Sequence, residues 1–168
     1  MMLKIDGNYT INYINIQTEY YVSIRYNQSM TQTPKTVSKL VIIDSQDQYL
    51  MMWRSEHPTY GTDPDLPGGT LDGTESPLET MLREVEEEAG VTVEPSAVTQ
   101  VYNGADYSGH GTHYVLYAAR VFERPGITMS WEHSSYQWVS KDEFVSLAKS
   151  ANDTYMHMVG DVIAARSE

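Results

Sequence analysis

Alternation of apolar and polar residues dominates the first part of the chain. Residues 9–26 are rich in tyrosine, isoleucine, valine and threonine, and residues 10–16 alternate between apolar and polar side chains. Because successive side chains of a strand point to opposite faces, this pattern predicts two strands, forming a hairpin that turns near residues 17–19. The polar stretch 27–35 is predicted to be a connecting loop.

Apolar runs at residues 40–43 and 49–53 predict a second hairpin, because the residues between them are typical of turns. Residues 55–67 contain three prolines and a glycine and are therefore predicted to be a loop. Further apolar or alternating runs predict strands at 98–102, 112–122 and 136–139.

The clearest helix prediction covers residues 76–89. Ser76 is a suitable N-cap, Pro77 suits the first helical position, and Glu79 completes a capping box. Gly90 is predicted to end this helix, because glycine readily adopts the left-handed conformation that follows many helices.

Two more helices are predicted nearer the C-terminus. Residues 140–143 repeat the capping pattern at the start of a second helix, and residues 153–165 predict a third. Because strands and helices are mixed along a chain of 168 residues, we expect an α/β fold with a single core.

The chain carries a formal net charge of −12, and the negative charge is concentrated in one segment. Residues 63–94 contain ten acidic residues and a single basic one, Arg83. Such a field repels nucleic acid and anionic membranes, so neither is expected as a partner. The segment is either a solvated acidic surface or a site for divalent cations.

Composition removes several other classes of site. The sequence contains no cysteine, which excludes disulfides, thiolate metal ligands and cysteine nucleophiles. No apolar run reaches the roughly 18 residues that span a bilayer, and the first ten residues lack the apolar region of a secretion signal. We therefore expect a cytoplasmic protein.

On a helical wheel of residues 76–89, Glu84, Glu87 and Glu88 fall together, roughly opposite the apolar face. That apolar face consists of Leu78, Leu82, Val85 and Ala89. The stacked carboxylates repel one another and lie near the helix end where the dipole disfavours negative charge. Mg²⁺ prefers such oxygen ligands, and the carbonyl of Gly68 could complete its coordination. The spacing alone leaves a metal site and an acidic solvent face equally open.

Residues 69–91 resemble the Nudix box, the motif of the Nudix hydrolase family. The motif reads Gly, five residues, Glu, seven residues, Arg-Glu, aliphatic, any, Glu-Glu, any, Gly, aliphatic. The matching residues are Gly69, Glu75, Arg83, Glu84, Val85, Glu87, Glu88, Gly90 and Val91. The resemblance implies an α/β/α sandwich with a mixed sheet formed by residues 36–168, with residues 1–35 as a β-rich N-terminal extension.

The same resemblance implies roles for residues of the motif. Glu84, Glu87 and Glu88 are similar to the family's metal ligands, one of which also activates water. Arg83 resembles the residue that orients these glutamates. Glu75 resembles the glutamate that holds the preceding loop against the helix.

Candidates for the site also lie outside the motif. Arg54 stands where an arginine at a strand end approaches the substrate phosphate in related proteins. Tyr107 lies near the position of a tyrosine in the family's dinucleoside polyphosphate hydrolases. We expect a supplementary base or metal ligand in a loop outside the helix, with Glu132 as the first choice and Asp106 as the second.

The activity implied by the resemblance is hydrolysis of a diphosphate linkage by water attack at phosphorus, with Mg²⁺ as cofactor and Mn²⁺ as a substitute. The metal would neutralise the phosphate oxygens and lower the pKa of a bound water. The expected substrate is a nucleoside diphosphate linked to another group: a nucleoside triphosphate, a dinucleoside polyphosphate or a nucleotide sugar.

Two other classes of function remain open. A Nudix-fold sensor would bind a nucleotide without turnover, and an acidic domain would bind a protein partner. The tyrosine-rich residues 9–26 would suit pairing with a second copy of the chain, since exposed strand edges invite such pairing. We therefore expect a homodimer.

Overall fold

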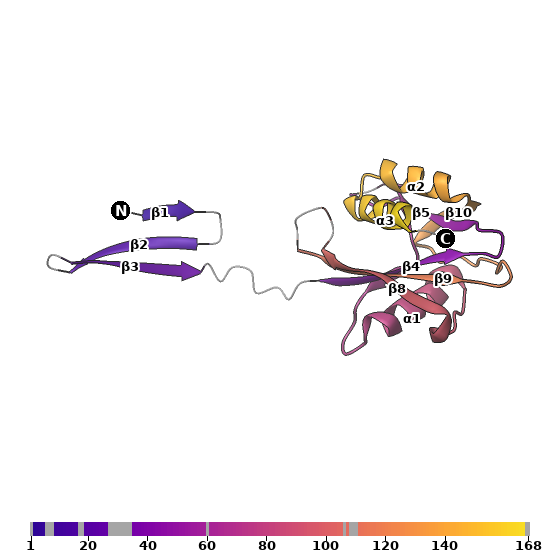
Figure 1. Ribbon diagram of the computed structural model, residues 1–168, viewed down its shortest axis with the longest axis horizontal. Coiled ribbons are helices and arrows are strands. Elements are labelled where there is room, and N and C mark those ends of the chain that lie inside the picture. The colour runs from indigo at the N-terminus through magenta and orange to yellow at the C-terminus, as the bar shows by residue number, and fades with distance from the viewer. Residues whose placement is uncertain are drawn as a thin grey trace. The chain divides into compact units, whose positions relative to one another are not determined.

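The computed structural model describes residues 2–5, 9–16, 19–26, 35–59, 61–105, 107 and 111–166. The chain divides into two compact units, Met1–Thr33 and Pro34–Glu168. The first unit contains an antiparallel sheet in the order β1 (Met2–Ile5), β2 (Tyr9–Ile16) and β3 (Glu19–Tyr26) (Figure 1).

Pairing of β2 with β3 confirms the first predicted hairpin. The register runs from Tyr9 opposite Tyr26 to Ile16 opposite Glu19. The turn between these strands lies at residues 17–18, outside the described residues. Strand β1 was not predicted, and it pairs with β2 in antiparallel orientation.

The second unit combines a sheet with helices. Its strands are β4 (Thr36–Ile43), β5 (Tyr49–Arg54), β6 (Pro64–Asp65), β7 (Gly68–Thr70), β8 (Val98–Ala105), β9 (His113–Arg120) and β10 (His133–Val139). Its helices are α1 (Pro77–Ala89), the 3₁₀ helix η1 (Pro95–Ala97), α2 (Lys141–Ser150) and α3 (Thr154–Ala165).

The sheet of the second unit is mixed. Its main path runs β10-β5-β4-β9-β8, and the short strands β6 and β7 pair with β5 and β4. β4 and β9 are parallel, whereas the other pairs are antiparallel. Figure 1 shows α1 on one face of the sheet and α2 with α3 on the other. The expected α/β/α sandwich is therefore present.

The core has two halves, one on each face of the sheet. Along β4, Leu40 and Ile42 pack with residues of α1, whereas Val41 and Ile43 pack with residues of α2 and α3. Neighbouring strand residues point to opposite faces, so a strand covered on both faces is apolar throughout. This explains why β4 and β5 appear in the sequence as continuous apolar runs.

The structure confirms the helix signals and extends several strands. Ser76 caps α1 in a reciprocal capping box with Glu79, and Gly90 ends it with φ 66°. The N-caps of α2 and α3 are Ser140 and Asp153. β8 and β10 are longer than predicted, and the region predicted as a pure loop contains β6.

The predicted second hairpin has an unusual form. β4 and β5 pair only between Ile43 and Tyr49. Beyond that point β4 pairs with β7 and β9 instead, and β5 pairs with β6 and β10. None of the helices among the described residues is both long and apolar enough to pass through a bilayer.

Candidate active site

The loop between β6 and β7 is held from two sides. The carbonyl of Leu66 accepts a hydrogen bond from the ammonium of Lys39 at 2.7 Å, and the Leu66 N–H donates to the hydroxyl of Tyr155 at 3.1 Å. The N–H of Gly68 donates to a carboxylate oxygen of Glu88 at 2.8 Å. The loop is therefore fixed both to the sheet and α3 behind it and to α1 beside it.

Two glycines at the start of β7, Gly68 and Gly69, allow this segment to approach its neighbours closely. We call residues 66–69 the glycine loop. Gly68 has a φ of 130°, and a Cβ at this position would collide with the backbone carbonyl of Ser38. A Cβ at Gly69 would lie 2.6 Å from the carboxyl carbon of Glu84. Any larger residue would push the strand or the Glu84 carboxylate away.

The three glutamates of α1, which the helical wheel places on one side of the helix, differ in their exposure. Glu88 is buried, with an exposed fraction of 6%. The Glu84 side chain is 19% exposed and that of Glu87 is 60% exposed. Glu88 is buried because α1 packs against β7 as well as the main sheet. That packing buries an acidic side of the helix beside the glycine loop.

Arg83 binds carboxylates on two sides. Its Nε and one terminal nitrogen donate to the two oxygens of Glu75, at 3.0 and 3.1 Å. Its other terminal nitrogen lies 2.8 Å from Glu84 and 3.2 Å from Glu87. Hydrogen bonds from Arg83, and another from Thr80, hold the pKa of Glu75 below its ordinary value. Arg83 thus links the loop before α1 to the acidic side of the helix.

The oxygen atoms around Gly68 suit a hard divalent cation. The carboxylates of Glu84 and Glu88 lie beside Gly69 and Gly68, and Gly68 adds a backbone carbonyl. Burial raises the pKa of Glu88, and the nearby Lys39 ammonium and the Gly68 N–H offset this only in part. A cation would stabilise the ionised carboxylate in that buried position.

The carboxylates are not gathered around a single point. Among the described residues, no three acidic or histidine side chains converge closely enough to hold a metal ion. The reason is visible in the ion pairs, since Glu84 and Glu87 are turned toward Arg83. When a cation binds, the carboxylates of Glu84 and Glu87 would leave Arg83 and turn toward the cation.

A cluster of buried charged and polar side chains lies behind the glycine loop. We call it the buried network, and it consists of Lys39, Arg54, Asp65, His133, Asp153 and Tyr155. At its centre, Asp65 is 3% exposed. Its oxygens lie 3.3 Å from the Lys39 ammonium and 3.2 Å from the Arg54 guanidinium. Nε2 of His133 lies 3.5 Å away, and the Tyr155 hydroxyl donates to the same carboxylate.

These partners determine the charge of Asp65. Burial alone would raise the pKa of its carboxyl, but the Lys39 ammonium and the other partners hold it well below the ordinary range. Arg54 also lies 3.5 Å from Asp153. The arginine expected at a substrate phosphate is therefore held by two carboxylates.

Of the residues of the buried network, only Arg54 was predicted from the sequence as a functional residue. One signal was available, because Lys39 directly precedes the apolar run of β4 and is only 6% exposed. A lysine there needs a buried partner. Nothing in the local spacing, however, identified Asp65, His133 or Tyr155 as that partner, since they come from distant parts of the chain.

The glycine loop, α1 and the buried network border a cleft of about 1190 Å³. It is lined by the predicted residues Arg54, Gly68, Arg83, Glu84, Glu88, Tyr107 and Glu132. The lining also contains residues that were not predicted, including Lys35, Lys39, Asp65, Asp153 and Tyr114. Of the predicted residues, Glu87 is outside this lining, on the exposed side of α1.

The candidates outside the motif occupy different surroundings. Tyr107 is 56% exposed, and its hydroxyl donates to Asp161 at 3.1 Å. Glu132 is exposed in the turn before β10, and its carbonyl accepts from the Ser55 N–H at 2.7 Å. Asp106 lies outside the described residues.

Comparison with known proteins links this geometry to a family. The sequence model of the NUDIX domain matches residues 33–158. A curated Mycobacterium tuberculosis protein with the provisional name 8-oxo-dGTP diphosphatase 3 is 31% identical over 103 residues. The matched region is 60% of this chain, and the chain spans 46% of that protein's length.

Solved structures share the fold at low sequence identity. A MutT protein from Methanosarcina mazei aligns with a TM-score of 0.60 and 22% identity, over 79% of this chain and 93% of its own. An Ap4A hydrolase from C. elegans aligns with a TM-score of 0.62 and 19% identity, over 77% and 93%. At these identities the likeness establishes the fold alone.

Proposed function

The chain belongs to the Nudix family, and we propose that it is a magnesium-dependent hydrolase of nucleotide phosphoanhydride bonds. Its substrate would be a nucleoside diphosphate linked to another group, cleaved by water attack at phosphorus. We assign catalysis to residues 36–168 and treat residues 1–35 as an extension.

The observation that carries this proposal is the fixed contact between the glycine loop and α1. Gly68 donates to the buried Glu88, and Gly69 leaves room for the carboxylate of Glu84. Both glutamates line a cleft that also contains cationic side chains, including Lys35 and Arg54. The cleft thus contains carboxylates that would bind a metal ion and basic side chains that would bind phosphate oxygens. This combination suits a polyanionic substrate.

A divalent cation bound by Glu84, Glu87, Glu88 and the Gly68 carbonyl would neutralise phosphate charge and lower the pKa of a water molecule. Arg83 would steer the released carboxylates, since it already contacts two of them.

Residues elsewhere in the cleft would act on the substrate. Glu132 lines the cleft from the turn before β10, and we assign it the removal of a proton from the attacking water. Tyr107 would contact the nucleotide, and Arg54, held by Asp65 and Asp153, would present a fixed donor to a phosphate oxygen.

Names of similar proteins indicate which substrates to test first. The mycobacterial relative is named for 8-oxo-dGTP and the C. elegans structure for Ap4A. The test panel would contain both compounds, together with dGTP, nucleotide sugars and ADP-ribose. Phosphate-bearing products would be separated after incubation with Mg²⁺ or Mn²⁺.

Matched variants of α1 test the site itself. Glu84→Gln and Glu87→Gln are each expected to lower turnover by about a hundredfold or more, because each removes a carboxylate that faces developing or bound charge. Glu86→Gln is the control, since Glu86 is an exposed glutamate on the same helix that, unlike Glu87, forms no ion pair with Arg83 among the described residues. Turnover that survives the Glu84 and Glu87 substitutions together would refute the site.

The nucleotide-sensor alternative gives a different result in the same experiment. A sensor would bind one member of the panel tightly and convert none of them. The intact set of carboxylates and the cleft beside it support hydrolysis over sensing.

A further inference from the structure

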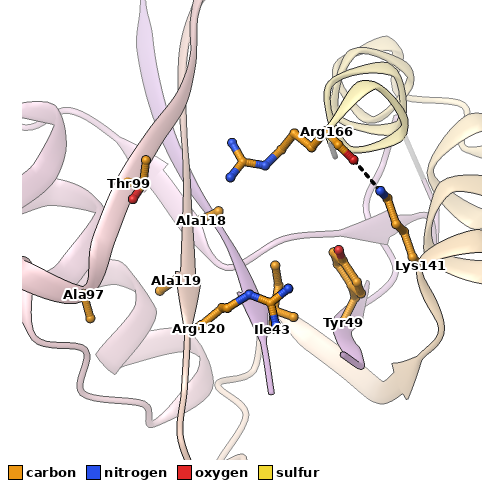
Figure 2. Close-up of a pocket in the computed structure, with 9 residues that line it drawn as sticks. All are labelled: Ile43, Tyr49, Ala97, Thr99, Ala118, Ala119, Arg120, Lys141 and Arg166. Atoms are coloured by element: carbon orange, nitrogen blue, oxygen red, sulfur yellow. Dashed lines mark hydrogen bonds between the residues drawn. The ribbon is translucent and has the colours of Figure 1, made fainter. Parts of the chain in front are cut away.

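A second pocket lies at the opposite ends of the strands that border the cleft. Its volume is about 320 Å³, within the range of small-molecule sites, roughly 300–1,000 Å³. It is lined by Ile43, Tyr49, Ala97, Thr99, Ala118, Ala119, Arg120, Lys141 and Arg166 (Figure 2). The cleft is lined by Lys39 of β4 and by the first residue of α3. This pocket is lined instead by Ile43, at the other end of β4, and by Arg166, which follows α3.

The lining of this pocket is cationic in an otherwise acidic protein. Of 11 lysine and arginine residues in the chain, three line the pocket, and none of the nine lining residues is acidic. Figure 2 shows Arg166 and Arg120 at opposite sides of the pocket, with Lys141 and Tyr49 on the helical side. Small residues of the strands face them.

Two of the three cations lack a carboxylate partner in the described part of the chain. Arg120 forms an ion pair with Asp47. Lys141 instead donates to the backbone carbonyl of Arg166 at 2.6 Å, which is a neutral acceptor. No ion pair joins Lys141 or Arg166 to any carboxylate of the described residues. The pocket therefore carries net positive charge next to an apolar floor.

The shape and chemistry of the floor limit the ligand. Ala118, on the same face of the sheet as Ile43 and Tyr49, is 7% exposed, and its small methyl group leaves space that a larger strand residue would fill. The side chains of Tyr49 and Thr99 add hydroxyl groups. Such a site favours a compact molecule with an anionic group facing the cations and an uncharged part facing the floor.

We propose that this pocket binds small molecules that carry a phosphate group, up to the size of a nucleoside monophosphate. A ligand here would not overlap the cleft, because α3 separates the two sites by its 12 residues, about 18 Å. The proposal goes beyond the hydrolase function and does not depend on it.

The test is a titration of the isotope-labelled full-length protein, followed by amide NMR in the presence of EDTA, which keeps divalent cations out of the cleft. Inorganic phosphate, AMP and adenosine are added separately. Phosphate and AMP are expected to shift the amide signals of Thr99, Ala118 and Ala119 in a saturable manner, and adenosine is not. Tighter binding of AMP than of phosphate would identify a phosphate monoester as the ligand; equal binding would identify free phosphate.

Variants decide whether the pocket cations are responsible. Arg166→Gln and Arg120→Gln are each expected to weaken binding about tenfold, since each removes a charge-assisted hydrogen bond. Lys149→Gln is the control, because Lys149 is an exposed lysine of α2 that pairs with Asp161 outside this pocket. Unchanged affinity in both arginine variants, or shifts confined to Gly68 and Gly69, would overturn the proposal.

Discussion

Asp65 and Glu88 are two carboxylates with nearly equal burial and opposite surroundings. Asp65 is 3% exposed and Glu88 is 6% exposed. Burial raises the pKa of Glu88, whose hydrogen bond comes from a neutral backbone N–H. Burial acts on Asp65 in the same direction, but its cationic partners reverse the effect and lower its pKa. The partners of Asp65 more than offset its burial, whereas Lys39 and the Gly68 N–H offset the burial of Glu88 only in part.

This difference separates a structural group from a functional one. A charge that the fold itself pairs with Lys39 and Arg54 needs no ligand. A buried charge that the fold offsets only in part is stabilised further when a cation binds from outside. Glu88 is such a group, and it lies against the glycine loop that borders the cleft.

The largest effect on stability is expected when the central charge of the buried network is removed. Asp65→Asn leaves the buried cation Lys39 and the half-buried Arg54 without their shared carboxylate. Breaking a buried pair in this way costs about 3–5 kcal/mol. The free energy of unfolding would be measured by urea denaturation at pH 7.

An exposed ion pair provides the control for this prediction. Asp47→Asn breaks the pair with Arg120, whose side chain is 53% exposed, and the expected loss is below about 1 kcal/mol. Asparagine also tolerates the positive φ of 56° at this position. If Asp65→Asn costs no more than Asp47→Asn, the buried network does not have the structural role assigned to it.

Glu88→Gln is expected to have the opposite profile, with activity lost and stability kept. Glutamine retains an oxygen that accepts from the Gly68 N–H but carries no charge to desolvate. We expect turnover to fall by about a hundredfold to a thousandfold. The free energy of unfolding of the metal-free protein should be unchanged or higher. A loss of stability as large as that of Asp65→Asn would contradict the contrast between the two carboxylates.

Local signals in the sequence predicted α1, which carries Glu88, but not the buried network around Asp65. Ser76 and Glu79 mark the start of α1 and Gly90 marks its end, so its bounds and capping could be predicted from the sequence. The family resemblance implied that Arg83 orients the glutamates, and its i,i+4 spacing from Glu87 permits the ion pair between them. Such features depend on neighbours along one helix.

The buried network depends instead on contacts between distant segments. Asp65 meets Tyr155 across 90 residues and Lys39 across 26. Only the sheet topology brings these residues together. The burial of Glu88 was missed for a related reason. A helical wheel represents only the residues of α1, so it does not show which of them are covered by β7. The exposed Glu87 was placed correctly.

The two carboxylates should also give opposite dependences of stability on pH. The folded pKa of Asp65 lies below the ordinary 3.8, so its contribution is complete above that pH and is lost as the pH falls through the folded pKa. The folded pKa of Glu88 lies above the ordinary 4.5, so its ionisation destabilises the protein as the pH rises through the folded pKa.

Urea denaturation of the metal-free protein at a series of pH values would measure both effects. Glu88→Gln should gain stability relative to the wild type as the pH rises above about 4.5. Asp65→Asn should approach the wild type as the pH falls below about 3.8. Curves that run parallel to that of the wild type in both variants would show that neither shift exists.

Within the buried network, a smaller loss of stability than for Asp65→Asn is expected for Tyr155→Phe. The hydroxyl of Tyr155 donates to Asp65 and accepts from the N–H of Leu66, while its ring stacks on Tyr114 with centroids 5.1 Å apart. Phenylalanine keeps the ring and removes both hydrogen bonds, so unfolding should become easier by about 1–3 kcal/mol. Turnover should fall less than in Glu88→Gln, because no charge in the cleft changes.

A double-mutant cycle makes this last prediction specific to the buried network. Once Asp65 is replaced, the hydroxyl of Tyr155 has lost its charged acceptor, so the second substitution should cost less than it does in the wild type. Pairing Tyr155→Phe with Glu86→Gln, on the far side of α1, should give additive losses. Additivity of Tyr155→Phe with Asp65→Asn would mean that the two side chains stabilise the fold independently, and the contrast with Glu88 would then rest on Lys39 and Arg54 alone.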